Sequence, residues 1–366
     1  MKRVLIFLHI VYSLSVRRPA GTLMAGIATC PEKRLGGAPF GGRWVIDRRD
    51  FTTLLGASLL APALPGCART AVEEPSRAIA PASFADTVRT IRAAIARDAA
   101  DPLVLPAGLS RLYEHGRPVE HAVVLFHGFT NCPQQFDELA RGYYARGCNV
   151  YVPRIPHHGL KDRLTHDLDN LTVSELQRFA EETFALARGL GTTVAALGLS
   201  LGGALVLWLA KTQPIDLAVP IAPFLLPLPD PQFVGAPALR LLRSIPSMYW
   251  WWDIRIKARS KPDYAYPGYP THAIAELVFF GDAIRSGAST TKPQGRHCVV
   301  VLNEQDNAVD NRVTRSLLAT WNRNGAGYRE LVLSGMPPKR HDVIDPTTFP
   351  QARSLVYPKL ESVVLG

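Results

Sequence analysis

The most constraining feature of this sequence is the regular alternation of two kinds of segment over residues 86–366. Short apolar runs of strand length alternate with longer segments whose apolar residues follow helical spacing. Runs that are apolar throughout are typical of strands buried on both faces, so the pattern predicts a doubly wound, mostly parallel α/β sheet. The expected strands are Ala122–Phe126, Asn149–Val152, Thr193–Leu197, Leu217–Ile221, Cys298–Leu302 and Glu330–Leu333.

Helices are expected between and around these strands, and one connection between strands is longer than a loop and a single helix require. Residues 223–295 separate two late strands, where a short loop and one helix would suffice. We therefore expect a core of residues 86–222 and 296–366, with a helical cap inserted over the site by residues 223–295. The expected helices are Asp86–Ala99, Gln134–Arg146, Ser174–Gly189, Gly202–Lys211, Asn311–Asn322 and Gln351–Val364.

The insertion contains an aromatic run, Tyr249–Trp252, with further apolar residues before and after it. One interpretation is that these side chains form an apolar wall for the acyl or alcohol part of a substrate. The other is that they build a core for the cap itself. The sequence favours neither.

Residues 1–66 hold nine of the 41 Lys and Arg residues and only three acidic ones, so much of the net charge of +10 belongs to them. Two basic groups there precede short apolar segments, and the second is a pair of arginines followed by Asp50 and Phe51. This second segment resembles a twin-arginine export signal, and the Leu-Pro-Gly-Cys at its end resembles a bacterial lipobox. We expect residues 1–66 to be a leader removed on export, Cys67 to be lipidated, and residues 67–85 to be a tether.

Alternatively, this apolar segment is an ordinary buried helix and Cys67 an ordinary thiol. Two signal-like segments in series are unusual, which suggests that translation starts near Val45 and that residues 1–44 are not translated. In the leading interpretation the protein is exported from a bacterium and is held on the periplasmic side of a membrane by an N-terminal lipid anchor.

Several classes of function are disfavoured. Residues 67–366 contain no dense Lys/Arg stripe interleaved with aromatics, which argues against nucleic acid as a partner. His157 and His158 are adjacent rather than four residues apart on a helix, so we predict no metal site. No glycine-rich phosphate-binding motif follows an early strand, and we predict no cofactor. Cys132, Cys148 and Cys298 are expected to be free, non-catalytic thiols.

The strongest chemical signal is Gly-Leu-Ser-Leu-Gly at residues 198–202, between an expected strand and an expected helix. A serine on such a tight strand-to-helix turn has a strained backbone and presents its hydroxyl above the sheet. Gly198 and Gly202 are expected because a Cβ at either position would collide with the neighbouring strand or helix. Ser200 is therefore the candidate nucleophile.

A serine nucleophile needs a base and a group that orients the base. His341 follows the expected strand Glu330–Leu333, and Asp306 follows Cys298–Leu302, which matches the order serine, acid, histidine of this topology. Glu304 is the main alternative to Asp306. Asp310 is better explained as a helix N-cap, and Asp342 is too close to His341 in sequence to face it well.

An oxyanion hole is expected from two backbone amides. The amide of Phe129 follows the strand-ending His127 and Gly128, and glycine there lets the backbone approach a substrate. The amide of Leu201 lies at the N-terminus of the helix that follows Ser200. For His127 we expect a role in supporting this loop rather than in proton transfer.

Together these motifs resemble the α/β-hydrolase superfamily over Leu112–Leu365. The segments HGFTNCPQQF (127–136), PRIPHHG (153–159) and GLSLGG (198–203) are similar to an exported esterase and lipase-like branch, near monoglyceride-lipase and carboxylesterase relatives. The resemblance implies a Ser200 acyl-enzyme, hydrolysed by water that His341 activates, and the oxyanion roles of Phe129 and Leu201.

The second segment of the resemblance departs from the usual Gly-His-Gly, since Pro156 and His157 precede His158, and His158 is expected to support the site only. The expected substrate is a small-molecule or lipid ester. Three alternatives stay open at this point: acyl transfer, peptide hydrolysis, and a catalytically silent lipid-anchored binding protein.

Overall fold

The computed structural model describes residues 83–228, 236–255, 257 and 262–366. The expected leader 1–66, the lipidation site Cys67 and residues 68–82 of the tether lie outside them. Among the described helices, none combines the length and the apolar character that crossing a membrane requires.

The main sheet has seven strands in the order β1-β3-β2-β4-β5-β8-β9, and all are parallel to their neighbours except β1, which is antiparallel to β3. The six predicted strands are confirmed, with ends within three residues of those expected. The edge strand β1 was not predicted because its three residues are only half-buried and form no apolar run. The strands are β1 (Arg111–Tyr113), β2 (Val119–Phe126), β3 (Asn149–Val152), β4 (Gly191–Leu199), β5 (Leu217–Ile221), β8 (His297–Asn303) and β9 (Arg329–Leu333).

The predicted helices are present, but two are shorter than expected. Residues 134–136 belong to a 3-10 turn, η2 (Pro133–Phe136), before α4 starts at Asp137. The expected helix 351–364 is broken at Val356, because Pro358 in the first turn of α11 has no N–H to continue the preceding helix. The helices are α3 (Phe84–Ala100), α4 (Asp137–Ala145), α5 (Val173–Ala187), α6 (Leu201–Thr212), α8 (Thr271–Arg285), α9 (Asn311–Arg323), α10 (Ala352–Leu355) and α11 (Tyr357–Leu365).

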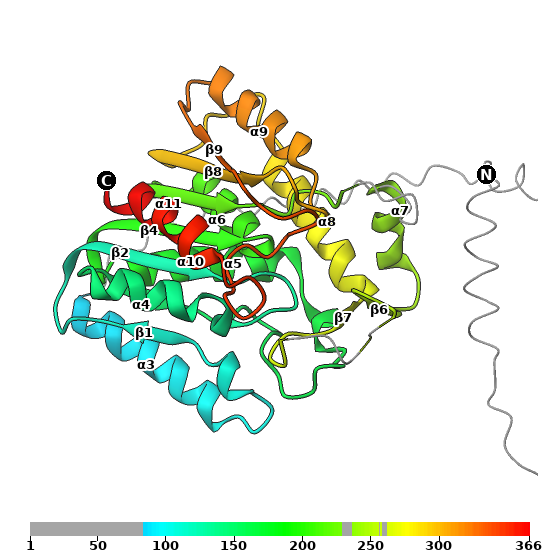
Figure 1. Cartoon of the computed structure of the whole chain (residues 1–366), viewed down its shortest axis with the longest axis horizontal. Coiled ribbons are helices and arrows are strands. Elements are labelled where there is room, and N and C mark those ends of the chain that lie inside the picture. Colours follow the sequence, from blue (N-terminus) through cyan, green and yellow to red (C-terminus); the bar gives the residue numbers. More distant parts are fainter. Residues whose placement is uncertain (1–82, 229–235, 256, 258–261) are drawn as a thin grey trace, which may run out of the picture. The chain divides into compact units, whose positions relative to one another are not determined.

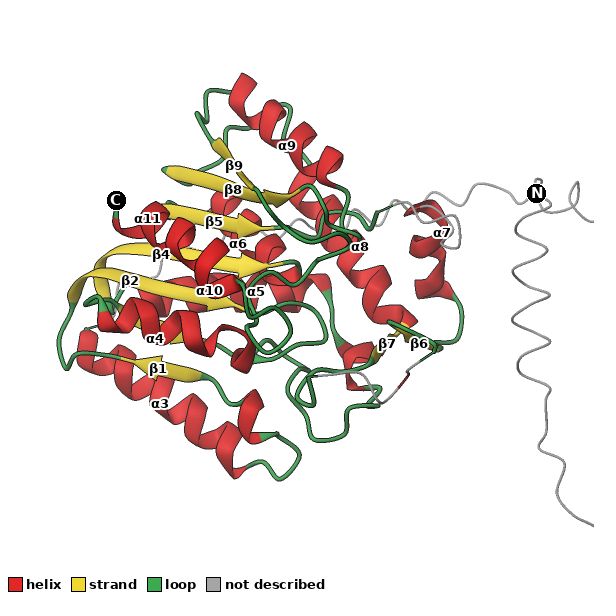
Figure 2. Cartoon of the chain, in the orientation of Figure 1, coloured by secondary structure: helices red, strands yellow, loops and turns green. Residues whose placement is uncertain are grey.

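Helices cover both faces of the sheet, as Figures 1 and 2 show. Helix α6 packs on β2, β4 and β5, with α5 and α8 beside it. Helices α4, α10 and α11 lie on the other face, where Arg146 pairs with Glu361 at 2.8 Å and Arg353 pairs with Glu138. Burial on both faces explains why residues 122–126 are apolar without alternation.

The long insertion is built from α7 (Ala236–Leu241), a two-stranded sheet of β6 (Tyr249–Trp251) and β7 (Gly268–Pro270), and α8. Helix α8 packs against α5 and α6, so the last part of the insertion is also a helix of the sheet's covering layer. The elements α7, β6 and β7 lie beyond one end of the sheet, at the right of Figure 1. The insertion leaves β5 at Ile221, so it starts at the carboxyl edge of the strands.

Candidate active site

Ser200 lies directly after β4 with a left-handed backbone, φ 58° and ψ −112°. Few non-glycine residues adopt such a conformation without a structural reason, and here hydrogen bonds hold the backbone on both sides. The Ser200 N–H donates to the carbonyl of Ile221 at 3.0 Å, and the Ser200 carbonyl accepts from the amides of Ala204 and Phe224. The residue is 7% exposed, so the strained turn presents the serine at the edge of the core.

The glycines on either side of Ser200 are required by the close packing of β2, β4 and α6. A Cβ on Gly198 would lie 2.3 Å from the backbone of Gly202, and a Cβ on Gly202 would lie 2.1 Å from the carbonyl oxygen of Phe126. These separations are far below a van der Waals contact, and the atoms concerned are backbone atoms that cannot turn aside. The structure therefore agrees with the steric reason for which glycine was expected at both positions.

The structure brings Asp306 and His341 together. The His341 Nδ1–H donates to Asp306 Oδ2 at 2.7 Å, and the Asp306 side chain is fully buried. The other oxygen of Asp306 accepts hydrogen bonds from the amides of Ala308 and Val309, at 2.7 and 3.1 Å. Because both oxygens are occupied, the carboxylate has one orientation and fixes the imidazole with its Nε2 free of this pairing.

The environment of His341 changes its pKa in two opposing ways. Burial lowers the pKa, but the hydrogen bond and negative charge of Asp306, with a further contribution from Asp342, raise it above the usual histidine value. The side chain keeps 23% of its exposure, so the imidazole is not sealed inside the protein.

The competing carboxylates have other structural roles. Glu304 is half exposed and pairs with Arg315. Asp310 accepts from the amide of Arg312 at 3.0 Å and caps α9, as expected. Asp342 accepts from two amides of the turn that follows it rather than from His341. Asp306 is thus the acidic partner of His341 among these carboxylates.

The first residues of the insertion, after β5, are joined to the loop that carries Asp306. The amide of Leu228 donates to Ala308 at 2.8 Å, and the amide of Asp310 donates to Leu226 at 3.0 Å. The Ser200 hydroxyl forms no hydrogen bond with any described residue, His341 included. Ser200, Asp306 and His341 all follow the carboxyl ends of strands in one half of the sheet, β4, β8 and β9.

The peptide between Gly128 and Phe129 is held in one orientation. Its carbonyl oxygen accepts from His127 Nδ1–H at 3.0 Å and from the amide of Asn131 at 3.1 Å. In a trans peptide the N–H points opposite to the C=O, so these bonds also fix the direction of the Phe129 N–H. That N–H has no hydrogen-bond partner among the described residues, and neither has the N–H of Leu201. Two free amides of this kind are what an oxyanion hole requires.

Both ring nitrogens of His127 are bound to backbone groups. Its Nε2 accepts from the amide of Ile155 at 3.1 Å, so the ring is neutral with its proton on Nδ1. Complete burial, with a smaller effect from His158, keeps the pKa of His127 well below the usual value. The neutral ring joins β2 to the loop after β3 and cannot exchange its proton without losing one of these bonds.

His158 lies beside this support, with its ring 5.2 Å from that of His127 and 5.9 Å from that of Phe129. Its Nδ1–H donates to the carbonyl of Pro156 at 2.7 Å, and burial lowers its pKa to about 4. His158 is fully buried, which agrees with a supporting place behind the candidate oxyanion loop.

The insertion contacts the candidate oxyanion loop through Thr130. The carbonyl of Thr130 accepts from the amide of Tyr266 at 2.7 Å, and its hydroxyl accepts from Trp252 Nε1–H at 2.9 Å. The Trp252 ring, 51% exposed, lies 6.2 Å from the Phe129 ring, and Tyr269 packs against both. This contact could not be predicted from the sequence, because more than 120 residues separate Thr130 from Trp252.

The apolar residues of the insertion lie in different environments. Phe224, Leu225 and Phe280 are buried in the main core. Trp252 instead keeps an exposed face beside Phe129. The apolar residues of the insertion therefore do not share one environment.

The three cysteines of the described residues, Cys132, Cys148 and Cys298, are buried and free. Burial raises the pKa of the Cys132 thiol to about 12 and that of Cys148 to about 11, so neither is an activated nucleophile. Within the residues described, no group of three or more His, Cys, Asp or Glu side chains is arranged to hold a metal ion.

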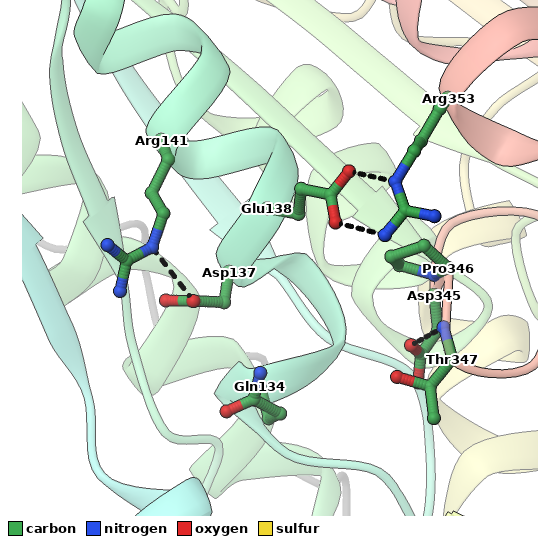
Figure 3. Close-up of a pocket in the computed structure, with 8 residues that line it drawn as sticks. All are labelled: Gln134, Asp137, Glu138, Arg141, Asp345, Pro346, Thr347 and Arg353. Carbon is green, nitrogen blue, oxygen red and sulfur yellow. Dashed lines mark hydrogen bonds and ion pairs between the residues drawn. The ribbon is translucent and has the colours of Figure 1, made fainter. Parts of the chain in front are cut away.

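A polar pocket of about 300 Å³ lies on the outer side of η2 and α4 (Figure 3). The arginines that line it are paired: Arg141 with Asp137 at 3.0 Å, and Arg353 with Glu138 through two hydrogen bonds. None of the candidate catalytic residues lines this pocket, and its charges are already compensated. It is separate from the site of Ser200, Asp306 and His341.

The family model described as the alpha/beta hydrolase family matches residues 123–350. A thermostable monoacylglycerol lipase of Bacillus sp. (strain H-257) is 34% identical over 110 residues, which are 30% of this chain and 41% of that protein. The match thus spans less than half the length of this curated relative.

Solved structures share the fold. A metagenome-derived lipolytic enzyme is 24% identical with a TM-score of 0.53, over 70% of this chain and 99% of that chain. The monoacylglycerol lipase of Paleococcus ferrophilus is 17% identical with a TM-score of 0.52, over 69% and 98%. A soluble variant of the Saccharomyces cerevisiae monoglyceride lipase, in complex with a substrate analogue, is 13% identical with a TM-score of 0.53, over 70% and 92%.

Proposed function

Because this chain belongs to the alpha/beta hydrolase family, we propose that it is a serine hydrolase that cleaves carboxylic esters. The observation that carries the proposal is the 2.7 Å hydrogen bond from His341 to the buried Asp306, at the same edge of the sheet as Ser200 on its strained turn. A buried carboxylate that orients an imidazole, at the edge of the sheet that also holds a serine on a strained turn, is the arrangement that activates a hydroxyl.

In the proposed reaction, His341 Nε2 takes the proton of Ser200 as the hydroxyl attacks the ester carbonyl. The amides of Phe129 and Leu201 stabilise the resulting oxyanion. His341 then gives the proton to the leaving alkoxide, which leaves an acyl group on Ser200. A water that His341 deprotonates attacks this acyl-enzyme, and the carboxylic acid is released. Asp306 keeps its negative charge throughout and stabilises the imidazolium.

For the substrate we propose a lipid-like acyl ester such as a monoacylglycerol. The support is the similarity to a protein named as a monoacylglycerol lipase, together with the cluster of Trp252, Tyr269 and Phe129 rings at the candidate oxyanion loop, in which Trp252 is exposed. An apolar surface next to the reacting carbonyl suits an acyl chain better than a charged substrate.

We further propose that the protein is exported and lipidated at Cys67, on the periplasmic side of a bacterial membrane. This rests on the twin arginine, the apolar segment after it and the Leu-Pro-Gly-Cys ending alone. Mass spectrometry of the native protein tests it, and the expected first residue is a diacylated Cys67. Peptides from residues 1–44 in the native protein would contradict both the leader and the proposed start near Val45.

Labelling by a fluorophosphonate probe tests the proposed activity directly. We expect the purified protein to be labelled on Ser200 and to hydrolyse p-nitrophenyl esters, and we expect the Ser200→Ala variant to do neither while keeping its fold. A well-folded protein that takes up no probe and hydrolyses no ester would favour a silent binding protein on the same scaffold.

A further inference from the structure

Gln135 is a buried polar residue that the proposed mechanism does not use. It lies in η2, directly after the candidate oxyanion loop, and is 2% exposed. A buried amide side chain is expected to satisfy its hydrogen-bonding groups, and the partners it selects show what it holds together.

The two ends of the Gln135 side chain are bound to two different loops of the candidate site. Its Oε1 accepts from the amide of Gly128 at 2.7 Å, and its Nε2 donates to Asp342 Oδ2 at 2.8 Å. The chemistry of the partners fixes the orientation of the amide, since a backbone N–H can only donate and a carboxylate can only accept. One side chain thus joins residues 128 and 342.

On the Gly128 side, the hydrogen bond completes the restraint on the candidate oxyanion peptide. His127 and the amide of Asn131 hold the carbonyl of Gly128, and Gln135 holds its N–H. With both groups of Gly128 bound, the N–H of Phe129 has one direction. A Cβ on Gly128 would meet the Gln135 side chain at 3.5 Å, an ordinary contact.

On the other side, Asp342 is part of the loop that carries His341. Its second oxygen accepts from the amides of Ile344 and Asp345, each at 3.0 Å, so the carboxylate is a fixed part of that turn. The hydrogen bond from Gln135 therefore reaches the residue adjacent to His341. The same carboxylate contributes to the raised pKa of His341.

From these contacts we infer that Gln135 is a positioning residue that holds the oxyanion loop and the His341 loop in register with one another. The inference rests on the proposed function, because it assigns Phe129 and His341 their roles in ester hydrolysis. Displacing either loop by about 1 Å would separate the oxyanion donor from the base and lower turnover by about 100-fold.

Exchanging the two polar partners tests the inference. In Gln135→Glu the bond to Gly128 is kept, but the introduced carboxylate faces that of Asp342, and we expect kcat to fall about 10- to 100-fold with KM within about twofold. In the double variant Gln135→Glu with Asp342→Asn, the introduced amide donates to the introduced carboxylate, and kcat should return to within about threefold of the wild-type value.

The neighbouring glutamine provides a matched control. Gln134 accepts from Arg111 at 2.8 Å and lines the polar pocket of Figure 3, and its side chain bonds neither Gly128 nor Asp342. Gln134→Glu adds the same negative charge one residue away, and we expect wild-type kcat. A similar loss in Gln134→Glu would overturn the inference, because charge near η2 would then explain the effect.

The pH profile separates positioning from charge. Asp342→Asn removes a charge that raises the pKa of His341, so the acid limb of kcat/KM should move to lower pH in that single variant. The double variant keeps one carboxylate at this place, so its acid limb should move less. Recovery of kcat should occur only in the double variant. Failure of the double variant to recover, with a normal thermal midpoint, would overturn the inference.

Two further outcomes are decisive. If Gln135→Glu does not fold, Gln135→Asn provides the test, because its side chain is one methylene too short to reach both partners. This variant should still lower kcat, and an unchanged kcat would overturn the inference. If fluorophosphonate does not label the wild-type protein, the proposed function is refuted instead. The variants are compared with the kcat of an active wild-type protein, so they test the inference only when the wild-type protein is labelled.

Discussion

Asp306 and His341 are separated by 35 residues in sequence, yet His341 Nδ1–H donates to the fully buried carboxylate of Asp306 at 2.7 Å. The carboxylate cannot turn away, because its other oxygen is bound by the amides of Ala308 and Val309. A rigid acceptor of this kind selects the tautomer and the ring orientation of the histidine. It also makes the site sensitive to pH in a defined direction.

The first prediction concerns that pH dependence. His341 can act as a base only when neutral, and its pKa is raised above the usual histidine value, which is about 6.5. Activity of the wild-type protein should therefore decline as the pH falls, starting at a higher pH than for an unperturbed histidine. Asp306→Asn should lower kcat about 10⁴-fold and move the remaining acid limb to lower pH.

The measurement is kcat/KM on a p-nitrophenyl ester from pH 5 to pH 9. Glu304→Gln is the matched control, because Glu304 pairs with Arg315 rather than with His341, and it should keep both the rate and the profile. An acid limb that stays in place in Asp306→Asn would show that His341 is not the group that titrates.

The second prediction separates two glycines of the candidate site. Gly202→Ala would place a Cβ 2.1 Å from the Phe126 carbonyl oxygen, and we expect it to lower the free energy of unfolding by at least about 3 kcal/mol. At Gly128 the nearest atom is 3.5 Å away, so Gly128→Ala should fold normally. Its methyl group should lower kcat/KM if a substrate carbonyl approaches this peptide. Urea unfolding and ester hydrolysis measure the two effects, and equal stability of the two variants would contradict the packing argument.

The third prediction uses the strained backbone of Ser200, with φ 58° and ψ −112°. Glycine adopts this conformation without the strain of about 1–3 kcal/mol that other residues incur, although it loses about 0.5–1 kcal/mol through chain entropy. Ser200→Gly should therefore be more stable than Ser200→Ala by roughly 1 kcal/mol, with both inactive. Thermal unfolding of the two variants side by side checks this, and a less stable Ser200→Gly would mean that the turn stores no strain.

The fourth prediction tests whether Trp252 contacts the acyl chain. Its ring is 6.2 Å from that of Phe129 and half exposed, whereas Trp251 packs against Tyr249. Losing contact with two methylenes corresponds to about 1.6 kcal/mol, so Trp252→Ala should lower kcat/KM on long-chain esters about 10- to 20-fold more than on acetate esters.

Trp251→Ala is the control for this measurement and should affect long and short esters alike. Trp252→Phe removes the hydrogen bond to Thr130 and reduces the size of the ring, but it keeps an aromatic ring at this place. It should therefore keep most of the chain-length preference. A uniform loss on all esters in Trp252→Ala would assign the residue to packing of the insertion.

Local patterns in the sequence were enough to predict the sheet and its layers. A strand buried on both faces must be apolar throughout, as residues 122–126 are, and the turn at Ser200 needs glycines at fixed offsets. The order of Ser200, Asp306 and His341 followed from the same topology. These features depend on neighbours in the chain or on the general rules of doubly wound sheets.

The break of the last helix at Val356 also has a local cause, Pro358, which the apolar periodicity of this segment concealed. Other features are set by contacts between distant segments. The edge strand β1 exists because β3 offers it an unpaired edge.

The links between Thr130 and Trp252, and between Gln135 and Asp342, join residues more than 120 positions apart. A polar side chain in a sequence carries no mark of its partner, because a hydrogen bond depends on direction and on a separation near 3 Å. Tertiary packing alone brings the two atoms to that separation, and so it alone decides which polar residues hold the site together.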